Sequence, residues 1–187
     1  MSPRKLTLDT DLTRRAFLRG SALALLGLAA GPATALALAP RRLRMLHTHT
    51  GERIDVVYAE EGAFLPDALH ALDRFLRDHR TGEVQAIDPQ VLDIAWSLAN
   101  AVDRPAGQFE IISGYRSAHT NEMLRAAGHG GVAKRSLHLA GRAIDLRMPG
   151  VDLRALRGAA IALGRGGVGF YAASGFVHVD NGRPRAW

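Results

Sequence analysis

Two histidines and one aspartate stand in segments whose residue types and spacing could bind a metal ion. His138 and Asp145 belong to the segment SLHLAGRAID at 136–145, and His178 belongs to GFVHVD at 175–180. Two imidazoles and one carboxylate would leave a fourth tetrahedral position for water, and zinc lowers the pKa of such a water to about 7 in hydrolases. The pattern predicts a metallohydrolase with one Zn²⁺ ion.

Strand-like segments can bring these three side chains together. Alternation over 143–148 directs Asp145 away from the face that carries Ile144 and Leu146, because successive side chains of a strand point to opposite faces. The same parity places His178 and Asp180 on one face of a strand at 176–180. A single histidine in an apolar strand is more often a core residue than a ligand, so the prediction depends on all three residues together.

The rest of the chain reads as one domain of helices and strands, long enough to bury a single core. Periodicity and turn residues predict a hairpin around Thr50, Gly51 and Glu52 and a strand at 109–112. Asp88 and Pro89 are typical of an N-cap followed by proline at the first helical position. The predicted helices cover 66–80, 88–102, 118–127 and 153–163. The first of these helices would include His70 and His79. The glycine-rich stretch 164–169 is predicted to be a turn.

The amino-terminal residues have the pattern of a twin-arginine export signal. The segment TRRAFLR at 13–19 precedes an apolar stretch at 22–30 and then small residues up to Ala39. The alternative is an anchoring helix, but Gly27, Gly31 and Pro32 interrupt the run, and a spanning helix needs roughly 20 apolar residues. We expect a signal peptide at 1–39 and a mature domain at 40–187, exported to the periplasm or cell envelope without stable membrane insertion.

Charge and cysteine content narrow the possible functions. The net charge is +6, of which residues 1–39 supply +3, so the predicted mature domain carries only +3. Its basic residues form no run backed by aromatic side chains, which argues against a nucleic-acid partner. The chain has no cysteine, so disulfides, thiolate ligands and cysteine nucleophiles are excluded.

Several motifs together resemble the M15-type zinc peptidases, and within them the exported group similar to murein endopeptidases. The motif S-x-H-x-x-G-x-A-x-D is complete at 136–145, SGYRS occupies 113–117 with Asn121 following, and RDHRTGEV occupies 77–84. The resemblance covers about residues 43–187. It implies an α+β fold of the Hedgehog/D,D-peptidase type, zinc held by His138, Asp145 and His178, and hydrolysis of the stem-peptide cross-links of peptidoglycan.

The resemblance also implies roles for the SGYRS motif. Arg116 matches the family arginine near the metal, where a guanidinium can hold a substrate carboxylate or a developing oxyanion. Ser113 and Tyr115 are its neighbours in the expected substrate-binding segment. The alternative for Arg116 is a purely structural ion pair.

One position departs from the family pattern. Many M15 enzymes carry E-x-x-H, in which the glutamate is the general base, but Gly175 stands three residues before His178. Asp180 is the nearest candidate base, and it could equally orient His178; deprotonation of water by zinc alone is a third option. The missing glutamate also allows a different class of function, a degenerate fold that binds peptidoglycan as an adaptor without cutting it. The type of cross-link, D,D or L,D, is left open.

Overall fold

The computed structural model describes residues 39–128 and 132–187. Apart from Ala39, the predicted export signal lies outside the described residues. Within the described part, one eight-stranded sheet has the order β3-β2-β1-β4-β5-β7-β6-β8. The strands are β1 (Arg41–His47), β2 (Arg53–Glu60), β3 (Ala63–Phe64), β4 (Gln108–Ser113), β5 (Ala143–Arg147), β6 (Gly167–Tyr171), β7 (Phe176–Asp180) and β8 (Arg185–Ala186). The helices are α2 (Pro66–Phe75), α3 (Pro89–Ala101), α4 (Ala118–Ala126) and α5 (Leu153–Leu163), with a 3-10 turn, η1 (Leu137–Ala140).

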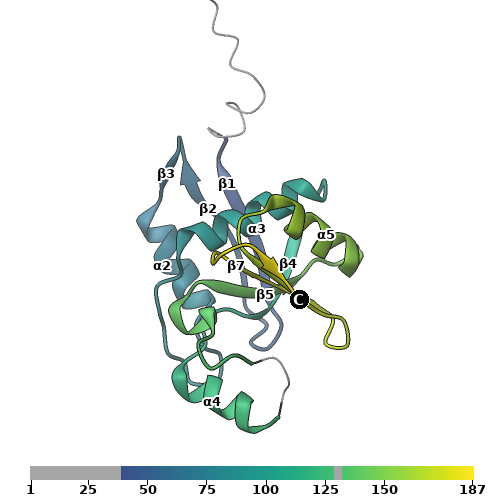
Figure 1. Ribbon diagram of the computed structural model, residues 1–187. Coiled ribbons are helices and arrows are strands. Elements are labelled where there is room, and N and C mark those ends of the chain that lie inside the picture. Colours follow the sequence, from purple (N-terminus) through teal and green to yellow (C-terminus); the bar gives the residue numbers. More distant parts are fainter. Residues whose placement is uncertain (1–38, 129–131) are drawn as a thin grey trace, which may run out of the picture.

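The hydrophobic core lies between the sheet and three of the helices (Figure 1). Helix α3 packs against β1 and β7, α5 against β6 and β7, and α2 against β2. Ile144 and Leu146 of β5 and Val177 and Val179 of β7 are all buried in this core. Because side chains alternate along a strand, the residues between them, Asp145 and His178, face the other side of the sheet.

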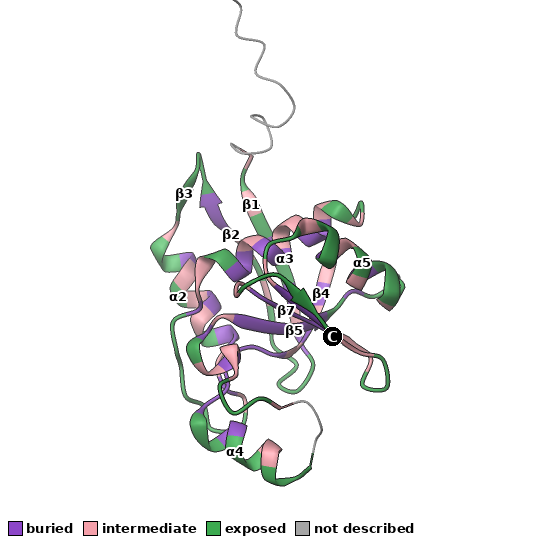
Figure 2. Ribbon diagram, in the orientation of Figure 1, coloured by how far each residue is buried: buried purple, intermediate pink, exposed green. Residues whose placement is uncertain are grey.

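Helix α4 lies apart from this core, below the sheet in the view of Figure 1. Figure 2 shows that β5 and β7 are buried along most of their length, whereas α4 is largely exposed. No helix in the described ranges is both long and apolar enough to cross a membrane.

Most elements confirm the predictions from periodicity and capping. The hairpin forms with β1 and β2 antiparallel. As predicted, Asp88 caps α3, and its side chain accepts a hydrogen bond from the backbone N–H of Gln90. Ser117 caps α4, and its side chain accepts a hydrogen bond from the backbone N–H of Thr120. Helix α5 has the predicted bounds. The coarse fold class, α+β, agrees with the structure, in which helices pack on one mixed sheet.

Two local predictions were wrong. Helix α2 ends at Phe75, so His79 lies in the turn after it, where the side chain of Asp78 accepts hydrogen bonds from the backbone N–H groups of Arg80 and Thr81. Such local acceptor contacts compete with the helical hydrogen bonds. The predicted turn at 164–169 instead leads into strand β6, which starts at Gly167.

The glycines of β6 have a packing role rather than a turn role. A Cβ added at Gly169 would lie 2.8 Å from the indole of Trp187, and one added at Gly167 would meet the carboxylate of Asp180. Glycine within a strand often marks such a close approach. These positions therefore let β8 and its flanking residues pack directly onto β6.

Candidate metal centre

Two strands and a 3-10 turn position the three predicted ligands. Asp145 on β5 and His178 on β7 are direct partners in the antiparallel ladder. His138 lies in η1. The Ser136 hydroxyl caps the start of this turn by accepting a hydrogen bond from the backbone N–H of His138, and Gly141 follows its last residue as the C-cap. Gly141 has a φ of 65°, a left-handed conformation that glycine adopts without steric cost, and this reverses the chain toward β5.

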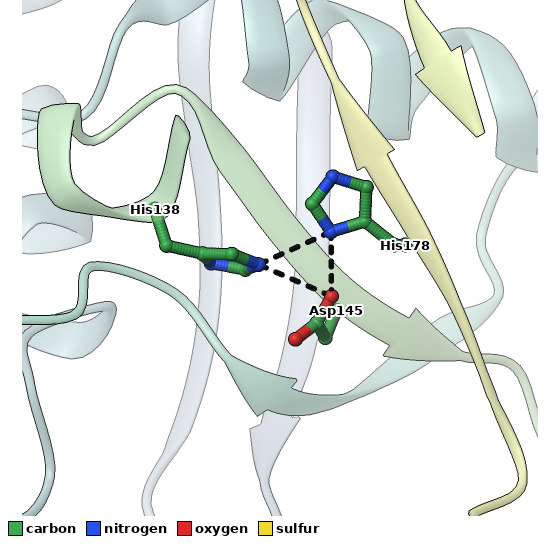
Figure 3. Close-up of side chains that lie close together, drawn as sticks. All are labelled: His138, Asp145 and His178. Carbon is green, nitrogen blue, oxygen red and sulfur yellow. Dashed lines mark hydrogen bonds and ion pairs between the residues drawn. The ribbon is translucent and has the colours of Figure 1, made fainter. Parts of the chain in front are cut away.

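One donor atom from each of these side chains converges on a common point (Figure 3). Nε2 of His138 lies 3.2 Å from Oδ1 of Asp145 and 3.1 Å from Nδ1 of His178. Nδ1 of His178 lies 2.8 Å from the same Asp145 oxygen. Ligands at about 2.0–2.1 Å from a tetrahedral zinc ion would be about 3.3 Å apart, so this triangle is close to the required size.

The remaining ring nitrogens show why a cation belongs in the triangle. Nδ1 of His138 lies 2.7 Å from the carbonyl oxygen of Gly114, and Nε2 of His178 lies 3.0 Å from Oδ2 of Asp180. A carbonyl or a carboxylate oxygen can only accept, so in the neutral rings these nitrogens carry the N–H. Both converging nitrogens then present lone pairs to the Asp145 oxygen and to each other, and a metal ion removes that repulsion. The donor set therefore fits Zn²⁺.

The protonation of these side chains follows from their burial and their neighbours. Burial lowers the pKa of His138, which keeps its ring neutral and able to bind metal. Burial opposes ionisation of Asp145, but the two histidines outweigh it and hold the pKa of that carboxyl well below its usual range. Burial would lower the pKa of His178, yet hydrogen bonds to Asp145 and Asp180 raise it. In the metal-free protein a proton thus competes for His178.

The predicted substrate-binding segment divides between the site and the core. Ser113 and Arg116 line the pocket that contains the three ligands, whereas Tyr115 lies outside its lining and packs against the hydrophobic core. The guanidinium of Arg116 is buried, and one of its terminal nitrogens lies 3.2 Å from Oδ2 of Asp145. Its Nε–H has no hydrogen-bond partner within the described residues. Arg116 therefore makes an ion pair with a predicted metal ligand, while its Nε–H is buried without a partner in the described part of the chain.

Asp180 lies behind His178 and is fully buried. Its Oδ2 faces His178 and also accepts a 2.6 Å hydrogen bond from Arg185. Its Oδ1 accepts hydrogen bonds from the backbone N–H groups of Gly167 and Gly182 and from Arg185. Burial opposes ionisation, but these donors lower the pKa of Asp180. A carboxylate with all of these donors in place is better suited to orient His178 than to accept a proton from water.

A pocket of about 340 Å³ contains the site. Residues that sequence reasoning missed form one of its walls: Tyr171 from β6, Phe176 from β7, and Arg185 and Trp187 at β8. The Tyr171 and Phe176 rings are stacked with centroids 4.6 Å apart, and Trp187 lies 5.3 Å from the His178 ring. The glycines of β6 were the available signal for this wall, because a strand with glycine marks close packing.

Comparison with known proteins agrees with this geometry. The sequence profile of the Peptidase_M15_2 family, described as "Peptidoglycan L,D-endopeptidase MepK", matches residues 35–187, which include all three converging side chains. The chain belongs to this M15 peptidase family. Its membership makes the chain a peptidase of the murein endopeptidase type, as the motifs at 113–117 and 136–145 had implied.

Two relatives show the extent of the similarity. The chain is 38% identical over 181 residues to the "Probable peptidoglycan L,D-endopeptidase MepK" of Haemophilus influenzae, with 95% of this chain and 96% of the relative covered. It is 39% identical over 150 residues to the "Peptidoglycan L,D-endopeptidase MepK" of Escherichia coli K12, with 79% and 80% covered. In each comparison, the similarity therefore extends over most of this chain and most of the relative.

The M15 glutamate position is occupied by a turn residue in this chain. Gly175 has a φ of 69° and directly precedes β7. Among the described residues that line the pocket, Asp145 and Asp180 are the carboxylates, and both are held by histidine and arginine partners. No further carboxylate replaces the missing glutamate in the described lining.

Proposed function

We propose that this protein is a zinc-dependent L,D-endopeptidase that hydrolyses stem-peptide cross-links of peptidoglycan. The observation that carries the proposal is the buried triangle of His138, Asp145 and His178, in which three lone-pair donors face one point. The choice of the L,D bond, rather than the D,D bond, is supported by the names of relatives that are 38% and 39% identical.

Each residue of the site has a proposed role. When bound, zinc would polarise the scissile carbonyl and make water a stronger acid. His138, Asp145 and His178 hold the ion, and Gly114 and Asp180 fix the two histidines in the ligating tautomer. The guanidinium of Arg116, which lines the pocket, steadies the developing oxyanion or a substrate carboxylate. Asp180 is a positioning residue in this mechanism rather than the general base.

The alternative function, a peptidoglycan-binding adaptor, requires that the metal be structural or absent. Structural zinc sites usually close with a fourth protein ligand. In the described residues the converging group contains three side chains, and it opens into the pocket. This arrangement favours catalysis over binding alone.

The proposal includes the cellular setting and the detailed fold. Residues 1–39 act as a twin-arginine signal, and 40–187 form the mature domain in the periplasm or cell envelope. The motif at 13–19 and the small residues before Pro40 support this division. The mixed sheet with helices packed on its core face is compatible with the Hedgehog/D,D-peptidase type, which we propose as the fold family.

Digestion of whole peptidoglycan sacculi tests the function directly. Zinc-loaded protein is incubated with sacculi, and the released muropeptides are resolved by mass spectrometry, beside a chelated sample and His138→Ala. We expect zinc-dependent loss of L,D-cross-linked dimers. Loss of D,D dimers instead would change the bond assignment, and intact dimers with the protein still pelleting on sacculi would support the adaptor.

A further inference from the structure

The pocket carries positive charge that has no acidic partner within the described residues. Four arginines line the pocket: Arg80, Arg116, Arg135 and Arg185. Arg116 is paired with Asp145 and Arg185 with Asp180. Arg80 and Arg135 make no ion pair within the described residues, and both are exposed. The pocket therefore presents two free guanidinium groups close to the proposed zinc site.

The sheet order places the two walls on either side of the metal. Strands β1 and β4 are parallel, so the end of β1, which leads to His49, and the end of β4, which leads to Arg116, lie at the same edge of the sheet. Continuing across the sheet come β5 with Asp145, β7 with His178, and then β6 and β8. A peptide bound across these strands would thus have a cationic wall on one side of the scissile bond and an aromatic wall on the other.

Arg80 is held in this position by its neighbours rather than left on a free loop. The buried carboxylate of Asp78 accepts a 2.9 Å hydrogen bond from the backbone N–H of Arg80 and another of 2.9 Å from the N–H of Ser117. His79, which lies between Asp78 and Arg80 in the chain, stacks on His49 with ring centroids 4.3 Å apart and planes at 6°. The turn is therefore fixed both to the segment that carries Arg116 and to the hairpin.

Arg80 belongs to the RDHRTGEV segment at 77–84, which has no part in the proposed zinc chemistry. We propose that Arg80, placed by Asp78 and by the stacking of His79 on His49, is a specificity-determining residue that binds a free carboxylate of the cross-linked peptide beside the scissile amide. The proposal rests on the proposed function. The chemistry is suitable because the residue that supplies the amine of the scissile amide has a carboxyl group of its own. A guanidinium can hold that group through two parallel hydrogen bonds.

Two synthetic cross-linked peptides test the assignment. They are identical except that the residue supplying the scissile amine ends in a carboxylate in one and in a carboxamide in the other. We expect the zinc-loaded wild type to prefer the carboxylate by roughly 10- to 100-fold in kcat/KM, the range for a hydrogen bond to a charged group. In Arg80→Gln this preference is lost through a higher KM, with kcat nearly unchanged. Arg80→Lys should recover part of it, because the charge is kept.

Controls separate this inference from the proposed function. Arg104→Gln, an exposed arginine outside the pocket lining, should keep the wild-type preference. Calorimetric titration with hydrolysis-resistant analogues of both peptides measures recognition without turnover. If wild type cleaves neither peptide but Arg80→Gln still loses carboxylate-dependent binding, the proposed function fails and the subsite stands. An unchanged carboxylate preference in Arg80→Gln would overturn the subsite.

Discussion

Oδ2 of Asp180 lies 3.0 Å from Nε2 of His178, the nitrogen that faces away from the converging ligands. The contact fixes the ring so that Nδ1 points to Asp145 and His138. Asp180 therefore acts on the proposed metal site through His178.

Asp180→Asn separates the positioning role from the role of a general base. A residue that orients a metal ligand typically changes metal affinity by about 10- to 100-fold when it is substituted. We expect that loss in a zinc competition titration, with much of the activity recovered at saturating zinc. Unchanged zinc affinity together with abolished turnover would instead identify Asp180 as the base.

Zinc removal should lower the stability of the protein as well as its activity. At a free zinc concentration of 100 times Kd, binding stabilises the folded state by about 2.7 kcal/mol. For a domain of this size, this raises Tm by roughly 5 to 10 °C. Thermal unfolding with and without chelator measures the difference. His138→Ala should show neither the shift nor hydrolysis of sacculi, whereas an equal zinc-dependent shift in the variant would contradict the ligand assignment.

Arg116→Gln should impair the chemical step. Loss of one donor to a developing oxyanion costs about 10²- to 10³-fold in rate. We expect a drop of this size in kcat/KM at saturating zinc. Arg116→Lys keeps the charge but lacks the planar guanidinium that can pair with Asp145 and donate to a substrate at the same time. Its kcat/KM should therefore lie between those of the wild type and Arg116→Gln. If kcat/KM of Arg116→Gln stays at the wild-type value, Arg116 has only a structural role, through its ion pair with Asp145.

Gly141→Ala should destabilise the fold at the turn that joins His138 to β5. The substitution places a Cβ in a left-handed conformation and against the backbone oxygen of Ala86. The two effects together cost roughly 2 to 5 kcal/mol. Gly150 is a matched control, because its φ is also positive but nothing lies near an added Cβ. Gly150→Ala should cost only roughly 1 to 2 kcal/mol in the same urea titration.

Buried His47 should make the stability of the metal-free protein depend on pH. Burial and the nearby His49 lower the pKa of His47 to about 4, from an ordinary value of about 6.5. The unfolded chain then binds a proton that the folded chain does not, so the stabilisation is complete above about pH 6.5 and is lost as the pH falls toward about 4. His47→Gln removes this titration. In urea titrations, the free energy of unfolding of the wild type should therefore fall more steeply than that of His47→Gln as the pH is lowered across this range. Parallel pH dependences of the two proteins would contradict the assignment.

The nature of the site could be predicted from the sequence because its signals are local. Alternation over 143–148 and 176–180 sends the apolar neighbours of Asp145 and His178 into the core, and the structure has this parity. Asp88 and Pro89 marked the start of α3 in the same way. The same local rules failed after Phe75, where Asp78 accepts hydrogen bonds both from the nearby backbone and from the distant Ser117. They also failed at Gly167, where close packing against Asp180 and Arg185 outweighed local preference.

The sequence by itself determined which residues could bind zinc, which way their strands face, and that the M15 glutamate is missing at Gly175. Only the tertiary structure decided what surrounds those residues. The approach of His138 to His178, 40 positions later in the chain, depends on which strands become neighbours in the sheet. So do the pairing of Asp180 with Arg185 and the approach of Arg80 to the pocket. Contacts between segments far apart in the chain leave no periodic pattern in either segment, because each is formed only when the core brings the two together.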